Sequence, residues 1–321
     1  MAIAASGIEP GQRKLNGPQT TGRTYSNLSQ PEYAIAHDIN LHVPMRDGVN
    51  LMADVHRPKA DGKFPALVAF SAYPRQIQNI GIPMGFVEAG QSDFFVPRGY
   101  VHVIANARGT NGSGGSYSFF DAQERRDVHD VVEWAAQQPW CDGNVGMIGI
   151  SYFAMAQLEA AVEQPPHLRA IFPLATSTSP GEITMHGGLF NKIFIYMFFR
   201  AVGLFASLSD DFLRGPLASA LTKIMRNPRI HAKWQHRNGE ATMVLLQNIV
   251  KGRYPAHPWD NFIQDLLLDH PYLDAYWEER DTLPLLHRVR IPTYLGCDWE
   301  NLTVHLGSTF AALNALPKDI P

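Results

Sequence analysis

Short apolar segments alternate with helical patterns along the chain, and this alternation restricts the folds that it can adopt. Residues 65–70, 101–105, 145–150 and 170–174 each have the length and composition of a buried strand. Strands and helices in alternation predict a mostly parallel, doubly wound sheet with helices on both faces. In such a sheet, functional groups are expected beyond the carboxyl ends of the strands.

A capped helix and a hairpin extend this prediction. Asp121 can cap a helix that has Glu124 three residues later, and the apolar residues that follow share one face. Residues 37–43 and 51–56 have the pattern of two strands, and the Asp-Gly step at residues 47–48 between them is typical of a tight turn. An antiparallel pair is therefore expected before the parallel strands.

The charge distribution limits the kind of partner. The 321 residues carry a formal net charge of −3, and the lysines and arginines are scattered along the chain. This pattern offers no basic surface to nucleic acid or to an anionic membrane, so we expect a small-molecule partner. Residues 193–208 are apolar but too few for a membrane span and are interrupted by Arg200, which favours a buried or pocket-lining helix.

The two cysteines, Cys141 and Cys297, lie far apart and without the spacing of metal ligands. This argues against a disulfide framework, a zinc site or a redox pair, and no cofactor motif is present in the sequence. The first residues also lack the basic and apolar regions of a secretory signal. We therefore expect a cytoplasmic protein without a metal or cofactor.

Ser151 lies where the predicted strand 145–150 meets a helix of small residues. A sharp strand-to-helix turn would lift its hydroxyl above the sheet, beside helix N-terminal amides that can stabilise an oxyanion. The usual motif has glycine two residues after the serine, where this chain has Phe153. On the local tripeptide alone, an ordinary helix N-cap explains Ser151 equally well.

The longer run from Trp140 to Tyr152 resembles the nucleophile region of the cocaine esterase and X-Pro dipeptidyl-peptidase-like family of α/β-hydrolases. Residues 46–58 are similar to the opening hairpin of that family, and residues 107–115 are similar to its loop after the fourth strand. The resemblance covers residues from about 36 to 316. It therefore involves most of the chain and favours a nucleophile over a simple N-cap.

The resemblance implies an α/β-hydrolase fold with an inserted helical cap. It also implies a serine hydrolase that cleaves an ester or amide through an acyl-enzyme on Ser151, as a carboxylesterase, an acylase or an X-Pro dipeptidyl-peptidase. The expected parts are an N-terminal arm (1–35), a hydrolase core (36–180 and 287–321) and a cap (181–286). Six aromatic residues of the cap either line an acyl pocket or fill its core: Phe190, Phe194, Tyr196, Phe198, Phe199 and Phe205.

Two oxyanion donors follow from the resemblance. Tyr73 comes after the third predicted strand, where family members carry a tyrosine whose hydroxyl contributes to the oxyanion hole. Tyr152 would contribute its backbone N–H, because it directly follows Ser151. The other interpretation of Tyr73 is an aromatic side chain packed at a turn.

The resemblance places the triad acid in the loop of residues 298–301. Relatives usually have aspartate where this chain has Asn301, with Glu300 beside it. Asparagine can orient an imidazole but stabilises its cation less well than a carboxylate does. Either Glu300 or Asp298 takes over this role, or the site is weaker, or the loop is simply a solvated acidic turn.

The general base is the largest departure from the family. Its histidine follows one further strand, and this sequence ends at Pro321, about where that strand is expected to begin. His305 comes too soon after the acid loop, and the cap histidines are expected to be structural: His186, His257 and His270. The sequence therefore predicts a sheet that is incomplete at its C-terminal end, a truncated or partial enzyme and very poor turnover. The alternative is a catalytically inactive, hydrolase-like module that binds a ligand or partner.

Overall fold

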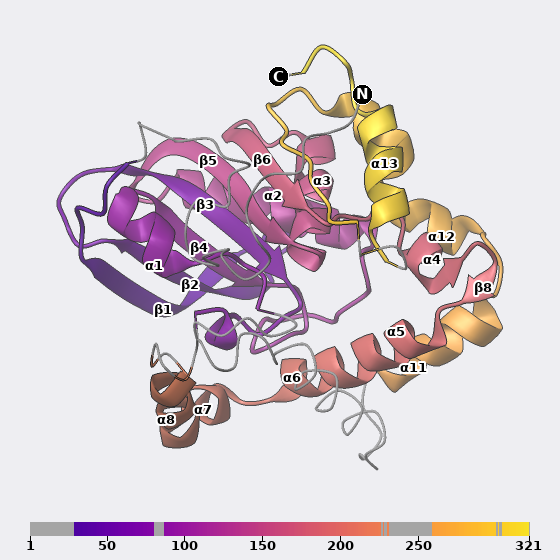
Figure 1. Cartoon of the computed structure of the whole chain (residues 1–321), viewed down its shortest axis with the longest axis horizontal. Coiled ribbons are helices and arrows are strands. Elements are labelled where there is room, and N and C mark those ends of the chain that lie inside the picture. The colour runs from indigo at the N-terminus through magenta and orange to yellow at the C-terminus, as the bar shows by residue number, and fades with distance from the viewer. Residues whose placement is uncertain are drawn as a thin grey trace, which may run out of the picture.

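The protein was analysed as a computed structural model, which describes residues 29–79, 87–225, 227, 230, 259–299, 301 and 304–320. Six strands form the central sheet in the order β1-β2-β4-β3-β5-β6 (Figure 1). The strands β4, β3, β5 and β6 are parallel, whereas β1 pairs antiparallel with β2 and β2 with β4. The mostly parallel sheet predicted from the sequence is confirmed. The strands are β1 (Ile35–Pro44), β2 (Asn50–Pro58), β3 (Phe64–Ser71), β4 (Val101–Asn106), β5 (Cys141–Ile150) and β6 (Leu168–Leu174).

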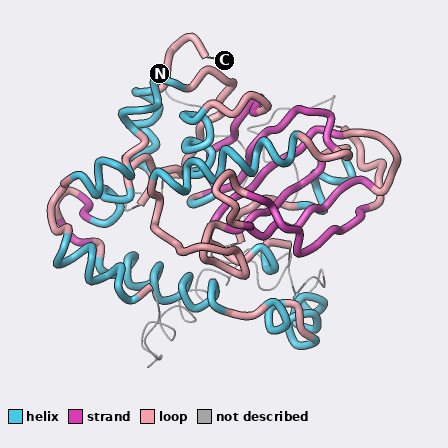
Figure 2. Tube along the Cα trace, turned by 180° about the vertical axis from the view of Figure 1, so that it is seen from behind, coloured by secondary structure: helices cyan, strands magenta, loops and turns pink. Residues whose placement is uncertain are grey.

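Helices cover both faces of this sheet. The crossover from β3 to β4 runs in the opposite direction to the crossovers from β4 to β5 and from β5 to β6, so right-handed connections put their helices on opposite faces. Figures 1 and 2 show α1 on one face of the sheet and α2 and α3 on the other. These elements are η1 (Arg75–Ile77), α1 (Ser92–Phe95), η2 (Val96–Arg98), α2 (Ala122–Ala136) and α3 (Tyr152–Glu163).

The predicted hairpin and capped helix are both present. In the hairpin, the Met45 N–H donates to the Val49 carbonyl at 2.8 Å. At the start of α2, the Asp121 side chain accepts from the Glu124 N–H at 2.9 Å. The apolar face of α2 is fully buried against the sheet, with Val128, Val131, Val132 and Ala135 in the core.

The segment after β6 passes below the sheet as a series of short helices, in which α5 and α6 lie end to end and α11 lies beside them (Figure 1). Residues 193–208 form α5, a π-helical turn and α6 in place of one regular helix, and Phe198 and Phe199 are buried. The elements are α4 (Pro180–Thr184), β7 (Met185–His186), β8 (Leu189–Phe190), α5 (Lys192–Met197), η3 (Phe198–Val202), α6 (Gly203–Ser207), α7 (Asp210–Leu213), α8 (Pro216–Met225), α11 (Asp260–Gln264), η4 (Asp265–Asp269), α12 (Ala275–Arg280) and η5 (Leu283–Arg288).

The chain returns to the sheet after η5. Residues 292–296 run parallel to β6, with isolated bridges from Ile171 to Thr293 and from Leu174 to Gly296. Helix α13 (Leu306–Ala315) then begins above the carboxyl end of the sheet. Within the described ranges, no helix is both long and apolar enough to cross a membrane.

A buried polar cluster joins the helical segment to the sheet. Arg75 of η1 and Asp54 of β2 are 2% and 1% exposed, and their side chains are 3.2 Å apart. Arg214, just after α7, reaches the other oxygen of Asp54 at 2.5 Å and also pairs with Asp210 at 3.0 Å. Arg75 donates in addition to the Asn111 carbonyl at 2.7 Å. Since η1 directly follows the turn that carries Tyr73, this cluster fixes that turn against both layers.

Candidate active site

Ser151 occupies the sharp turn between β5 and α3. Its backbone has φ 60° and ψ −116°, a conformation that L-residues rarely adopt and that costs about 1–3 kcal/mol. The Ser151 N–H donates to the Leu174 carbonyl at 3.0 Å, and the Ser151 carbonyl accepts from Ala154 and Met155 at 2.9 Å each. The neighbouring strand and the first turn of α3 therefore hold the strained residue in place.

The geometry of this turn explains the departure at Phe153. Gly149 has φ +129°, and a Cβ atom there would lie 2.3 Å from the Cβ of Phe153. The aromatic side chain thus packs directly over the glycine, where no larger residue fits. Ala154, in the first turn of α3, is completely buried. The nucleophile turn tolerates Phe153 because Gly149 leaves room for it.

Tyr73 lies in the turn after β3, with only 4% of its side chain exposed. Its hydroxyl hydrogen-bonds to Ser151, while its ring packs edge-on against Tyr152 at 5.6 Å and Phe153 at 5.8 Å between centroids. The Asn106 side chain donates to the Tyr73 carbonyl at 2.7 Å and so fixes the turn. The structure thus brings the Tyr73 hydroxyl and the predicted nucleophile together.

The Tyr73 hydroxyl is held in its neutral form. Burial raises the pKa of Tyr73 well above its ordinary value, and the Glu88 carboxylate raises it further, whereas the hydrogen bond with Ser151 acts in the opposite direction. A neutral phenol keeps its O–H and can donate to a developing oxyanion.

Tyr152 begins α3, so its backbone N–H is one of the helix N-terminal groups without an intrahelical acceptor. Its hydroxyl points away from Ser151 into the core, 3.0 Å from the Tyr117 hydroxyl and 2.5 Å from the Glu124 carboxyl. Burial raises the pKa of Tyr152, and the Glu124 charge raises it further. The main chain of Tyr152 faces the turn, and its side chain anchors the turn from behind.

His305 corrects the prediction that no histidine of this chain reaches the serine. It directly precedes α13, is 4% exposed, and its Nε2 lies 3.0 Å from Ser151 Oγ. The sequence argument failed because residues 292–296 already run parallel beside β6, so a residue soon after them in sequence can face Ser151. The only sequence signal was a histidine at the start of the last helical pattern.

The electrostatic setting of His305 favours the neutral imidazole. Burial lowers its pKa to about 4, against the opposing effects of the Thr176 carbonyl and the Asp298 charge. Among the described residues, the buried Nδ1 atom has no partner within strict hydrogen-bond geometry, although the Thr176 carbonyl acts on the ring as a hydrogen-bond acceptor. A carboxylate bonded to Nδ1, as in a complete triad, is therefore not part of the described site.

The predicted acid loop contributes differently from what the sequence suggested. The Asn301 carbonyl accepts from the N–H groups of His305 at 3.3 Å and Leu306 at 2.9 Å, so Asn301 orients the histidine through its main chain. Glu300 lies outside the described residues. Asp298 is the carboxylate whose charge acts on His305.

A small cavity of about 20 Å³ lies over the nucleophile, room for about one water molecule. Of the six cap aromatics proposed for an acyl pocket, Phe194 and Phe198 line it. Phe119 and Phe120, which the sequence argument did not single out, form another wall. The full lining is Tyr73, Phe119, Phe120, Ser151, Tyr152, Met155, Ile183, Phe194, Phe198 and His305.

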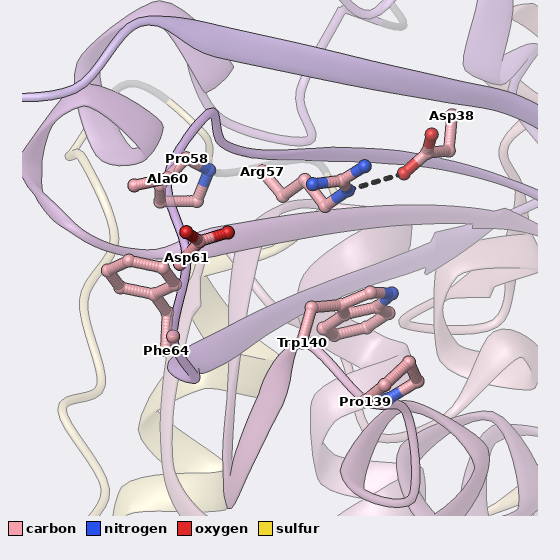
Figure 3. A pocket seen from close by; sticks show the side chains of 9 residues that line it. Asp38, Arg57, Pro58, Ala60, Asp61, Phe64, Pro139 and Trp140 are labelled. Carbon is pink, nitrogen blue, oxygen red and sulfur yellow. Dashed lines mark hydrogen bonds and ion pairs between the residues drawn. The ribbon is translucent and has the colours of Figure 1, made fainter.

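The other hollows lie apart from the serine. One of about 680 Å³ borders the opposite side of α4 and includes Glu182 and Trp277. Another, of about 330 Å³, surrounds the Asp38–Arg57 ion pair and Trp140 (Figure 3). Trp140 precedes the 10-residue strand β5 and Ser151 follows it, so they are about 30 Å apart along the strand.

The cap histidines do not reach the serine in the described parts of the chain. His186 lies in β7 and is exposed, and His270 pairs with Asp274 at 2.7 Å. His257 lies outside the described residues. Nor do the described residues contain a cluster of three or more His, Cys, Asp or Glu side chains that could hold a metal ion.

Comparisons with known proteins bear on the whole chain. Residues 47–320 match the family described as X-Pro dipeptidyl-peptidase (S15 family). Cocaine esterase of Rhodococcus sp. (strain MB1 Bresler) is 30% identical over 279 residues, which cover 83% of this chain and 44% of the esterase. A putative Xaa-Pro dipeptidyl-peptidase of Bacillus cereus is 28% identical over 207 residues, 52% of this chain and 36% of that protein. The chain thus spans less than half the length of these curated relatives.

Solved structures give the same picture. A CocE/NonD family hydrolase from Staphylococcus aureus superposes with a TM-score of 0.65 and 25% identity, covering 89% of this chain and 45% of that structure. An α-amino acid ester hydrolase, 18% identical, superposes with a TM-score of 0.55 over 94% of this chain and 49% of that structure, a likeness of fold alone.

Proposed function

The chain belongs to the X-Pro dipeptidyl-peptidase (S15) family and has the α/β-hydrolase fold predicted for it, and on this basis we propose that it is a serine hydrolase. It would cleave an ester or amide through an acyl-enzyme on Ser151. One observation carries the proposal: the Ser151 hydroxyl stands on a strained strand-to-helix turn with His305 Nε2 at 3.0 Å and the Tyr73 hydroxyl as a second partner. An N-cap serine requires neither partner.

In the proposed mechanism, Ser151 Oγ attacks the substrate carbonyl carbon as its proton passes to His305 Nε2. The carbonyl oxygen becomes negative and is stabilised by the Tyr73 hydroxyl and the Tyr152 N–H. His305 then gives its proton to the departing alcohol or amine. Water attacks the acyl-enzyme and loses a proton to His305, which returns it to Ser151 Oγ as the acid product leaves.

Asp298 supplies the negative charge in this proposal. Its effect on His305 is electrostatic, so it stabilises the imidazolium formed during attack without a direct hydrogen bond. Asn301 orients His305 through its carbonyl, and Glu300 remains a sequence-based candidate for the acid. Without a carboxylate on Nδ1 among the described residues, His305 is a weaker base than the histidine of a complete triad, and slow turnover is expected.

The cap proposed for residues 181–286 decides the substrate. The curated relatives are named as a cocaine esterase and Xaa-Pro dipeptidyl-peptidases, so aryl esters, amino-acid esters and X-Pro amides are the classes to compare. Phe194 and Phe198 of this segment line the cavity and favour an apolar acyl group. Because that cavity has the volume of about one water molecule, these side chains must move apart to admit a substrate.

The competing proposal is a hydrolase-like module that binds a ligand without turnover. Two observations favour it: the lack of a carboxylate on His305 Nδ1 among the described residues, and the small cavity. Labelling by a fluorophosphonate probe separates the two proposals, because the probe reacts with an activated serine. We expect labelling and p-nitrophenyl butyrate hydrolysis by the wild-type chain and by Ser207→Ala, an exposed control, but neither with Ser151→Ala. A wild-type chain that resists the probe would support the binding module.

A further inference from the structure

Glu124 lies beneath the nucleophile turn, where the proposed mechanism assigns it no role. Its side chain is 3% exposed. One carboxyl oxygen, Oε1, lies 2.5 Å from the Tyr152 hydroxyl, which is also 3.0 Å from the Tyr117 hydroxyl. The polar tip of Tyr152 is therefore fixed from two directions inside an otherwise aromatic core.

The other oxygen of Glu124 holds a strained piece of backbone. The Phe120 N–H donates to Oε2 at 3.1 Å. Phe119 and Phe120 have φ of 61° and 63°, and two consecutive bulky residues in this left-handed region are unfavourable without support. Both of their side chains line the cavity over Ser151. Glu124 thus supports one wall of the site as well as Tyr152.

The contacts of Glu124 connect it to both proposed oxyanion donors, the Tyr152 N–H and the Tyr73 hydroxyl. The Tyr152 backbone carries the first donor, and its ring packs against Phe120 at 4.2 Å. The opposite contact of the same ring is Tyr73, edge-on at 5.6 Å, whose hydroxyl is the second donor. A change in the position of the Tyr152 ring therefore moves the backbone donor directly and the Tyr73 hydroxyl through the ring contact.

The carboxyl group of Glu124 lies in surroundings that make it unfavourable for the stability of the fold. Burial, together with the charges of Asp121 and Asp127, raises its pKa to about 8, against the opposing effect of its hydrogen bonds with Tyr152 and Phe120. The fully buried Glu159 on α3 and Glu124 repel each other when both are charged. The positive charge of Arg125 lowers the pKa of Glu159, and the Arg125 side chain also donates to the Glu279 carbonyl. Burying an acid among other acids costs free energy that an apolar side chain would avoid.

At neutral pH the carboxyl of Glu124 is mostly protonated, because its pKa of about 8 lies above that pH. Its O–H can then donate to the Tyr152 hydroxyl, which in turn donates to Tyr117. A glutamine can make the same pattern, with its amide N–H in place of the carboxyl O–H. The contact therefore depends on hydrogen bonding more than on charge.

We propose that Glu124 is a positioning residue for the oxyanion hole, acting through the Tyr152 hydroxyl and the Phe120 N–H. This inference rests on the proposed function. Glu124 touches no reacting atom in it; it sets where the Tyr152 N–H and, through ring contact, the Tyr73 hydroxyl lie.

The test compares four variants of the full chain in p-nitrophenyl butyrate hydrolysis, with melting temperatures alongside. Glu124→Leu removes both hydrogen bonds and should lower kcat about 30- to 100-fold with KM within threefold, since misplacing an oxyanion donor affects the transition state and not substrate binding. Glu124→Gln should restore kcat to within about threefold of wild type. Glu159→Gln, an equally buried acid without a contact to Tyr152, should leave kcat within twofold.

Tyr152→Phe removes the same hydrogen bond from the other partner and keeps the ring, so it serves if Glu124→Leu fails to fold. It should lower kcat about tenfold, again with little change in KM. Variants that melt at a lower temperature but keep wild-type kcat would overturn the positioning role and leave the proposed function standing. A wild-type chain that neither hydrolyses the ester nor reacts with the fluorophosphonate would overturn the proposed function, and the positioning role with it.

Discussion

Ser151 Oγ and His305 Nε2 lie 3.0 Å apart, although 154 residues separate them in the chain. The contact exists because the turn after β5 raises the serine above the sheet, while residues 292–296 run parallel beside β6 and lead the chain to the same end of the sheet. It gives the chain a serine and an imidazole in proton-transfer range. This contact can serve catalysis only when His305 is neutral, and the pH dependence of the rate measures that protonation state.

Replacing His305 should remove the base. We expect His305→Ala to lower kcat for p-nitrophenyl butyrate roughly 10²- to 10⁴-fold, the usual contribution of a general base. His270→Ala is the matched control, because His270 pairs with Asp274 outside the cavity lining and should leave the rate unchanged. Equal rates for His305→Ala and wild type would mean that another group activates Ser151.

The acid limb of the pH–rate profile should lie unusually low. His305 acts as a base only when neutral, and burial lowers its pKa to about 4, so the rate should stay nearly constant from pH 8 to about pH 5 and fall below that. Asp298→Asn removes the charge that opposes this shift and should move the limb lower still. Brief initial-rate assays across this range measure it. If the acid limb instead has its midpoint near pH 6.5, the ordinary pKa of histidine being about 6.5, then the base is more exposed to solvent than His305 is in this structure.

Removing the Tyr73 hydroxyl should affect the transition state alone. The Tyr73→Phe side chain keeps its edge-on packing against Tyr152 and Phe153, so the melting temperature should change little. The loss of one oxyanion donor is expected to lower kcat about 10²- to 10³-fold with KM nearly unchanged. Steady-state kinetics beside thermal unfolding provide both numbers. If kcat holds, Tyr73 is a packed aromatic and not a donor.

The sequence predicted those parts of the site that depend on local structure. Ser151 was identified because a buried strand, a serine and a helix of small residues follow one another directly. Tyr73 was identified through the family resemblance, which places a tyrosine just after the third strand. Both positions are fixed within a few residues of chain, by β5 with α3 and by β3, so pattern and resemblance sufficed.

The parts set by tertiary folding were missed. His305 reaches Ser151 only through tertiary folding, which brings together two residues 154 positions apart, and no periodicity encodes that contact. Phe119 and Phe120 enter the cavity because both have positive φ, which their residue types do not suggest. The apolar run 193–208 predicted a helix, but a π-helical turn interrupts it at η3 and changes which aromatics face the cavity. Local propensity cannot anticipate such packing choices.

The buried Arg75–Asp54 pair should be essential for folding. Arg75→Met leaves Asp54, 1% exposed, with Arg214 as its remaining charged partner, and removing one partner of a buried pair typically costs about 3–5 kcal/mol. Arg57→Met is the matched control, because its pair with Asp38 is about one-third exposed and should contribute less than about 1 kcal/mol. Urea unfolding gives both free energies. Similar losses for the two variants would contradict the role assigned to burial.

Two sheet histidines that are buried in neutral form should contribute stability that is lost as pH drops below about 6.5, whereas Glu124, whose pKa is raised, contributes in the opposite direction. Burial lowers the pKa of His56 to about 4 and that of His102 to about 3, from 6.5 in the unfolded chain. The unfolded state therefore binds more protons than the native state between these values, so stability is present above pH 6.5 and is lost as pH falls toward the folded pKa. Between pH 7 and pH 5 the two should together account for a loss of about 4 kcal/mol.

Substitution at His102 isolates its share of this pH dependence. His102 bonds to Ser92 at 2.7 Å and to the Ala89 carbonyl at 3.1 Å, contacts that a glutamine amide can partly replace. His102→Gln should reduce the slope of unfolding free energy against pH by about 1.4 kcal/mol per unit between pH 6 and pH 4, since one proton no longer binds on unfolding. His42→Gln, which removes an exposed imidazole, should keep the wild-type slope. If His102→Gln also keeps it, the acid sensitivity arises elsewhere and His102 is not held neutral by burial.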